Sequence, residues 1–226
     1  MAENNIQVSQ EIIMPRPLER PQKKRTREMM NDQNAFTWES VMPQLKQEQQ
    51  KGKTIVVTNG HFVLFHSGHN VSLEQAREVG MTQRGEENDD GVILLAIVNA
   101  GHQTELKDPV KASAQTDRDR ALSVYDSRHS DLVVISEAPA GDQTLVTDFN
   151  KLRETGLINS NLIYVKGGDY GVTENVPPEA RIVQESGGQF VIVDRVGGYS
   201  TSSQVDKMFA AAVKAGLIVA VPQNAR

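Results

Sequence analysis

The stretch KTIVVTNGHFVLFHSGH, residues 53–69, decides the fold. It opens with a run of β-branched residues over 53–58, which is typical of a buried strand. A loop that contains three histidines follows, and a helical pattern then extends from about Gly68 to Val79. A buried strand, a loop and a helix in succession form the unit from which α/β folds are built.

The same alternation repeats along the chain. Further strands are predicted at 92–98, 132–135, 162–165 and 190–193, and helices at about 116–125, 144–154, 178–186 and after residue 200. The apolar runs are continuous rather than alternating, so both faces of the sheet should be covered. We therefore predict a Rossmann-like, doubly wound, five-stranded parallel sheet with helices on both faces, and ligands beyond the carboxyl ends of its strands.

The chain before the first strand divides into two parts. Residues 1–34 show no sustained apolar period and are predicted to be a disordered tail, whose basic run over 20–27 is interpreted as solvated. Residues 35–52 predict a short helix, capped by Thr37 or Asn34, and a linker into the main domain at 53–226.

The composition excludes several classes of protein. A chain of 226 residues with 38% hydrophobic content can bury one substantial core. The lack of cysteine excludes disulfides, thiolate metal sites and cysteine nucleophiles. A net charge of −5 argues against a surface built for nucleic acid. With no long apolar window and no secretory signal, we expect no membrane span and a cytoplasmic location.

Two histidines mark a candidate anion site. His66 and His69 lie three residues apart, where the loop turns into a helix. A helix start offers unpaired N–H groups and a positive dipole end, so phosphate is its natural occupant. Phosphoryl and nucleotidyl transfer depend on stabilising charge on phosphate oxygens, and two imidazole donors suit that task. A zinc ligand and a capped core histidine stay open as alternatives, because His-x-x-His alone is a weak pattern.

This loop resembles the His-x-Gly-His motif of the cytidylyltransferase-like nucleotidyltransferase superfamily and, within it, the adenylyltransferase domain of ADP-heptose synthesis. Further segments resemble that family in the expected order over residues 53 to about 208: VN at 98–99, LK at 106–107, DRA at 119–121, VKGGDY at 165–170 and GYSTS at 198–202. The matching loop residues are Thr58, Asn59, Gly60, Phe62, His66, Gly68 and His69.

The resemblance implies an enzyme that joins a nucleoside triphosphate, ATP by preference, to a sugar phosphate such as heptose 1-phosphate and releases pyrophosphate. Mg²⁺ would accompany the triphosphate, with no protein ligand assigned. His66 and His69 would bind the triphosphate and stabilise the transition state, while Lys107 would supply positive charge. The implied nucleotide-binding residues are Thr58, Asn59, Gly60, Phe62, Gly68, Asn99, Lys166, Gly167, Gly168, Asp169, Ser200 and Thr201.

The chain also departs from the family pattern. His61 and Val63 replace the usual cysteine and aspartate, and AGH at 100–102 stands where the family continues with Ser-Asp. These changes leave the acceptor open. The alternatives are CTP with glycerol, choline or ethanolamine phosphate, ATP with a flavin or pantetheine phosphate, and a nucleotide-binding regulator without turnover. The apolar stretches at 208–213 and 217–221 could cover the core or a partner subunit in a homo-oligomer.

Overall fold

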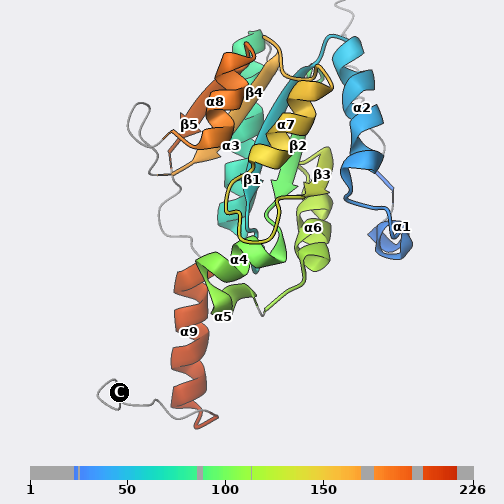
Figure 1. Ribbon diagram of the computed structural model, residues 1–226. Helices are drawn as coiled ribbons and strands as arrows, with labels where there is room; N and C mark the ends of the chain where they lie inside the picture. Colours follow the sequence, from blue (N-terminus) through green and yellow to red (C-terminus); the bar gives the residue numbers. More distant parts are fainter. Residues whose placement is uncertain are drawn as a thin grey trace, which may run out of the picture.

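The sheet of this protein is entirely parallel. The computed structural model describes residues 23–24, 26–85, 89–112, 114–168, 176–194 and 201–217. Within them the strand order is β3-β2-β1-β4-β5, with β1 at the centre (Figure 1). The strands are β1 Thr54–Gly60, β2 Val92–Val98, β3 Leu132–Ile135, β4 Leu162–Gly167 and β5 Gln189–Val193. The predicted five-stranded parallel sheet is therefore confirmed.

Helices cover both faces of this sheet. The longer helices are α2 Trp38–Gln50, α3 Ser67–Arg84, α6 Asp117–Asp126, α7 Val146–Glu154, α8 Pro178–Glu185 and α9 Thr201–Lys214. Ile55 and Val57 of β1 pack in one apolar cluster with residues of α2, α7 and α8. Val56 points the other way, into a second cluster with residues of α3 and α6. The sheet is thus doubly wound, as predicted.

Three short helices were not predicted. They are α1 Thr26–Asn31, α4 Gly101–Lys107 and α5 Pro109–Ala112. The prediction that residues 1–34 are disordered is wrong for 26–31, which form α1. The guanidinium of Arg118 donates to the carbonyls of Met29 and Asp32 and so ties this segment to α6. Such long-range contacts leave no periodic signal in a local window.

One helix is longer than its sequence pattern predicts. The polar composition of residues 81–90 predicts a surface insertion. In the structure, α3 continues through Arg84 and ends at Gly85, whose φ of 67° is the left-handed conformation that favours glycine. The prediction of an insertion is therefore wrong for residues 81–84, which belong to α3.

A buried polar contact ties α2 to the rest of the fold. Trp38 Nε1 donates to Asp148 Oδ1 at 2.7 Å, and Ser136 Oγ donates to Asp148 Oδ2 at 2.6 Å. Asp148 is fully buried, and this burial raises the pKa of its carboxyl group. The predicted cap of α2 is also confirmed, because the Thr37 side chain accepts from Ser40 N.

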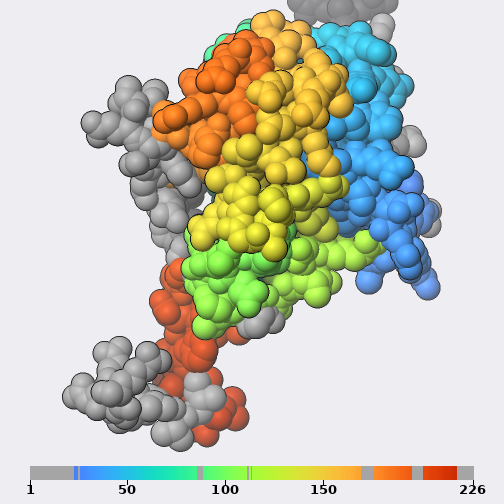
Figure 2. All heavy atoms as spheres, in the orientation of Figure 1, coloured from blue at the N-terminus to red at the C-terminus, as the bar shows by residue number. Residues whose placement is uncertain are grey.

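The last helix projects from the body of the protein. None of the residues of α9 is buried, and Met208 and Phe209 are 64% and 52% exposed. Figure 1 shows α9, in red, extending away from the sheet, and Figure 2 shows the same red segment projecting from the body of the protein. The prediction that residues 208–213 cover the core is therefore wrong. The alternative, that they contact a partner subunit, stays a prediction. In the described part of the chain, no helix combines the length and apolarity that crossing a membrane requires.

Candidate active site

A cavity of about 810 Å³ lies at the carboxyl ends of β1, β2 and β4. This is the position that an open parallel sheet predicts for its ligands. The cavity is lined by every predicted site residue that the structure describes: Thr58, Asn59, Gly60, Phe62, His66, Gly68, His69, Asn99, Lys107, Lys166, Gly167, Gly168 and Thr201. The two other predicted residues, Asp169 and Ser200, lie outside the described residues.

The loop between β1 and α3 has a strained backbone. Phe62 and Leu64 have φ angles of 50° and 48°, a region that residues with a side chain rarely adopt. Contacts from around α6 hold this shape: Arg120 Nη1 donates to the His61 carbonyl at 2.6 Å, and Leu64 N donates to Gln115 Oε1 at 2.7 Å. Strain of this kind costs about 1–3 kcal/mol per residue and persists only where the surroundings enforce it.

The backbone fixes the orientation of both histidine rings. Gly68 N donates to His66 Nδ1 at 3.1 Å, and His66 N donates to His69 Nδ1 at 3.3 Å, which together form a reciprocal capping box. A neutral imidazole has one N–H donor and one acceptor, so Nδ1 as acceptor puts the proton on Nε2. Each ring therefore has an Nε2–H donor available for a ligand.

Both histidines are neutral at pH 7. Burial lowers the pKa of His69 to about 3, with a smaller contribution from the neighbouring His66. Burial also lowers the pKa of His66. The two rings stack with their centroids 3.9 Å apart, a geometry that would be unfavourable between two cations. The site therefore offers two uncharged hydrogen-bond donors rather than two positive charges.

The start of α9 reaches this loop. Thr201 Oγ1 donates to the Val63 carbonyl at 3.0 Å and lies 3.4 Å from His66 Nε2. The two helix N-termini that the sequence assigned to phosphate, those of α3 and α9, therefore meet at the same side of the cavity. The positive ends of both helix dipoles favour an anion there.

A chain of polar side chains forms the floor of the cavity. Asn59 Nδ2 donates to Asn99 Oδ1 at 3.1 Å, and Asn99 Nδ2 donates to Gln103 Oε1 at 3.2 Å. On the other side, the Tyr164 hydroxyl lies 2.8 Å from Asn59 Oδ1 and 3.2 Å from Glu179 Oε1. The sequence predicted the two asparagines but missed the other three residues.

The missed residues had only weak signals in the sequence. Gln103 belongs to α4, which was not predicted, and Glu179 lies in the first turn of α8. Tyr164 is the one residue with a polar tip among the four buried residues of β4, and a buried tyrosine hydroxyl needs a hydrogen-bond partner. That requirement alone could have pointed to it.

The cavity contains charges of both signs. Its described lining includes the lysines Lys107 and Lys166 and the carboxylates Asp108 and Glu179. Lys166 Nζ donates to Glu179 Oε1 at 3.2 Å, and both side chains are largely buried. Lys107 lies at the end of α4 and is an exposed residue of the lining.

The structure explains one departure from the family pattern. A Cβ atom at Gly101 would lie 2.7 Å from Asp117 Oδ1, and Gly101 N donates to Asp117 Oδ2 at 2.7 Å. The carboxylate of Asp117 thus occupies the space that a side chain at position 101 would need. His61 lines the cavity with its Nδ1 atom 3.0 Å from Thr104 Oγ1, whereas His102 is not among the lining residues.

Metal ligation finds no support in the described residues. Among them, no group of three or more His, Asp or Glu side chains is placed to hold a metal ion. His66 and His69 use their Nδ1 atoms for backbone hydrogen bonds, so only the Nε2 atoms could ligate zinc. A tetrahedral zinc site needs further protein ligands.

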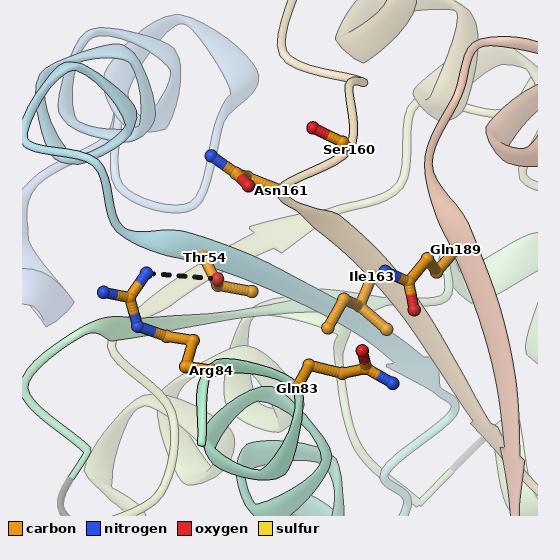
Figure 3. A pocket seen from close by; sticks show the side chains of 7 residues that line it. All are labelled: Thr54, Gln83, Arg84, Ser160, Asn161, Ile163 and Gln189. Atoms are coloured by element: carbon orange, nitrogen blue, oxygen red, sulfur yellow. Dashed lines mark hydrogen bonds between the residues drawn. The ribbon is translucent and has the colours of Figure 1, made fainter. Parts of the chain in front are cut away.

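A second recess of about 310 Å³ lies at the opposite, amino end of β1 and β4 (Figure 3). Its lining residues are Thr54, Gln83, Arg84, Ser160, Asn161, Ile163 and Gln189. Arg84 Nη1 lies 3.5 Å from Thr54 Oγ1 and donates to the Gly52 carbonyl at 2.9 Å. None of the predicted site residues lies here, so the candidate site is the cavity at the carboxyl ends.

Comparisons with known proteins agree with the resemblance seen in the motifs. The chain matches no protein-family profile. It is similar to the bifunctional protein HldE of Syntrophotalea carbinolica, with 28% identity over 75% of this chain, of Magnetococcus marinus, with 30% over 76%, and of Azorhizobium caulinodans, with 32% over 70%. The chain spans only 30%, 31% and 28% of the length of these relatives. The resemblance predicted from the motifs is therefore confirmed as a sequence similarity to HldE proteins over 70–76% of this chain.

Proposed function

We propose that this protein is a nucleotidyltransferase that joins ATP to a sugar phosphate such as heptose 1-phosphate and releases pyrophosphate. The observation that carries the proposal is the pair of neutral imidazoles, His66 and His69, whose Nδ1 atoms accept from the backbone. Both histidines and Thr201 line a cavity at the carboxyl ends of the strands, where His66 Nε2 lies 3.4 Å from Thr201 Oγ1. The similarity to HldE supports the same assignment.

In the proposed reaction, an oxygen of the acceptor phosphate attacks the α-phosphorus of the triphosphate in line. The bond between the α-phosphorus and the bridging oxygen breaks, and pyrophosphate leaves with the electron pair. Negative charge grows on the leaving oxygens, so donors that bind them more tightly in the transition state accelerate the step. His66 and His69 would act there as fixed donors, and no covalent enzyme intermediate is needed.

Neutral donors suit this task because they do not have to change protonation state. The capping box and the surrounding ring contacts hold both imidazoles before the substrate binds. Preorganised donors of this kind need no reorganisation at the moment of reaction. Lys107, at the rim, would add positive charge near the phosphates.

Mg²⁺ belongs to the proposal as a companion of the triphosphate. The described lining offers two carboxylates, Asp108 and Glu179, and Glu179 is bound to Lys166. This donor set fits an ion that keeps phosphate oxygens and water as most of its ligands. When bound, the ion would neutralise phosphate charge. We further propose a cytoplasmic enzyme whose partners are ATP or CTP and a phosphorylated small molecule, with no nucleic acid or membrane involved.

The test is pyrophosphate release by the purified protein with Mg²⁺. ATP and CTP are each combined with heptose 1-phosphate and with glycerol 3-phosphate. The matched variants are His66→Asn and His66→Ala: asparagine can still cap α3 but lacks the Nε2–H donor, whereas alanine loses both. We expect release with ATP and the sugar phosphate, and a decrease of about 100- to 1,000-fold in His66→Asn with little change in its unfolding midpoint.

The outcomes separate the candidate functions. Release with CTP and glycerol 3-phosphate alone would replace the acceptor and the base but keep the reaction. Nucleotide binding without release for any pair would favour a regulator. Full activity in His66→Asn would reject the proposed role of the imidazole.

A further inference from the structure

The hydrogen bonds on the cavity floor have a single direction, and the backbone sets it. Gln103 Oε1 accepts from Ala100 N at 2.9 Å, and Gln103 Nε2 donates to the Thr144 carbonyl at 2.8 Å. These two backbone partners fix which end of the amide faces Asn99. Because Gln103 Oε1 accepts, Asn99 must present its Nδ2 donor to it.

The same logic continues across the sheet. Asn99 has used its amide nitrogen, so its Oδ1 accepts from Asn59 Nδ2. Asn59 then presents Oδ1 to the Tyr164 hydroxyl, which donates its one hydrogen at 2.8 Å. The Tyr164 oxygen therefore has no hydrogen left for Glu179.

The direction of this chain determines what Glu179 can bind. Its Oε1 atom lies 3.2 Å from the Tyr164 oxygen, and the hydrogen that it accepts comes from Lys166 Nζ, also at 3.2 Å. Its Oε2 atom is buried without a hydrogen-bond partner in the described residues. Glu179 is only 3% exposed, so its negative charge depends on the Lys166 ammonium.

This ion pair changes the charge of the cavity wall. Without Glu179, the wall at the end of β4 would present the charge of Lys166 to the cavity, where the proposed function places the phosphates. We propose that Glu179 sets the affinity of the site for its product. By pairing with Lys166 it makes this wall neutral, and so weakens the binding of pyrophosphate enough for the product to leave. The inference rests on the proposed function, and it assigns to α8 a control over product affinity.

The test compares Glu179→Gln with Glu185→Gln. Both substitutions remove one negative charge from α8, but Glu185 is exposed at the other end of the helix. Glutamine at 179 can donate from its amide to the Tyr164 oxygen, so the floor stays hydrogen-bonded. Titration calorimetry with inorganic pyrophosphate should show about tenfold tighter binding to Glu179→Gln than to the wild type, and no change for Glu185→Gln.

Turnover supplies a second readout. If tighter product binding slows release, pyrophosphate should inhibit Glu179→Gln at about tenfold lower concentration, and kcat should fall while KM for ATP falls with it. A merely structural role would instead lower kcat without tightening either ligand. Equal pyrophosphate affinity in the wild type and Glu179→Gln overturns this inference alone. No binding of ATP or pyrophosphate to any of the three proteins overturns the proposed function as well.

Discussion

At the scale of single residues, the histidine pair serves two purposes with two ring nitrogens. The Nδ1 atoms of His66 and His69 complete the hydrogen bonds at the start of α3, and this use leaves the Nε2–H groups for a ligand. Local structure and chemistry therefore depend on the same side chains. A substitution that tests the chemistry must preserve the cap, which is why asparagine is more informative than alanine at position 66.

The low pKa of His69 makes stability depend on pH. In the unfolded chain its pKa is close to the ordinary value of 6.5, whereas burial lowers it to about 3 in the folded protein. Below pH 6.5 the unfolded state binds more protons, so stability falls as the pH decreases towards 3. At pH 5 this group should cost about 1–2 kcal/mol relative to pH 7.

Urea unfolding at pH 7 and pH 5 measures that cost. His69→Gln retains the capping box, since glutamine is a favoured residue at this helical position, but does not titrate. The loss of stability between the two pH values should be smaller in this variant by about 1–2 kcal/mol. An identical loss in both proteins would show that His69 is not the group responsible.

Residue identities predicted the composition of the site better than its electrostatics. The glycines and histidines at 58–69 indicated an anion site because a loop entering a helix has few alternatives. The strongly lowered pKa of His69 could not be predicted, since it depends on burial. Nor could the pairing of Lys166 with Glu179, because the two residues meet only when α8 packs on β4.

At the scale of elements, the close approach of α3 to the sheet depends on Gly80. A Cβ atom there would lie 2.6 Å from Val56 Cγ2 and 3.0 Å from Val92 Cγ1. Two effects oppose each other in Gly80→Ala. Alanine is favoured over glycine within a helix by about 1 kcal/mol, but overpacking a rigid core costs about 1–3 kcal/mol. Both contacts are to β-branched side chains on strands, so we expect the clash to win.

The free energy of unfolding in urea decides between these effects. Gly80→Ala should be less stable than the wild type by about 1–2 kcal/mol net. The control Glu78→Ala, at an exposed position of the same helix, should stay within about 0.5 kcal/mol. A stabilised Gly80→Ala would mean that α3 can move away from β1 and β2 at little cost.

The elements that the sequence predicted are those whose signal is local. Every predicted strand is present, because a continuous apolar run that is buried on both sides has one common explanation. The polar helices α4 and α5 have no apolar period to detect. Strand order is not a local property either, since Ile55 pairs with Leu162.

At the scale of the whole molecule, α2 is attached through one buried polar contact as well as its apolar side. Trp38→Phe keeps most of the packing but removes the N–H that donates to Asp148 Oδ1. Asp148 would still accept from Ser136 Oγ and Glu137 N, so the loss should be about 1–3 kcal/mol in urea unfolding. The double variant Trp38→Phe/Asp148→Asn should lose less than the sum of the two single variants; simple additivity would show that the contact contributes nothing.

The central position of β1 has a consequence for the order in which the protein becomes functional. A ribosome releases the histidine loop before Lys166, which follows about a hundred residues later, and before Thr201, which follows later still. Since β1 pairs with β4 and Thr201 bonds to the Val63 carbonyl, a nascent chain cannot assemble the cavity before the start of α9 emerges. A chain cut short anywhere before residue 201 would therefore lack part of the cavity lining.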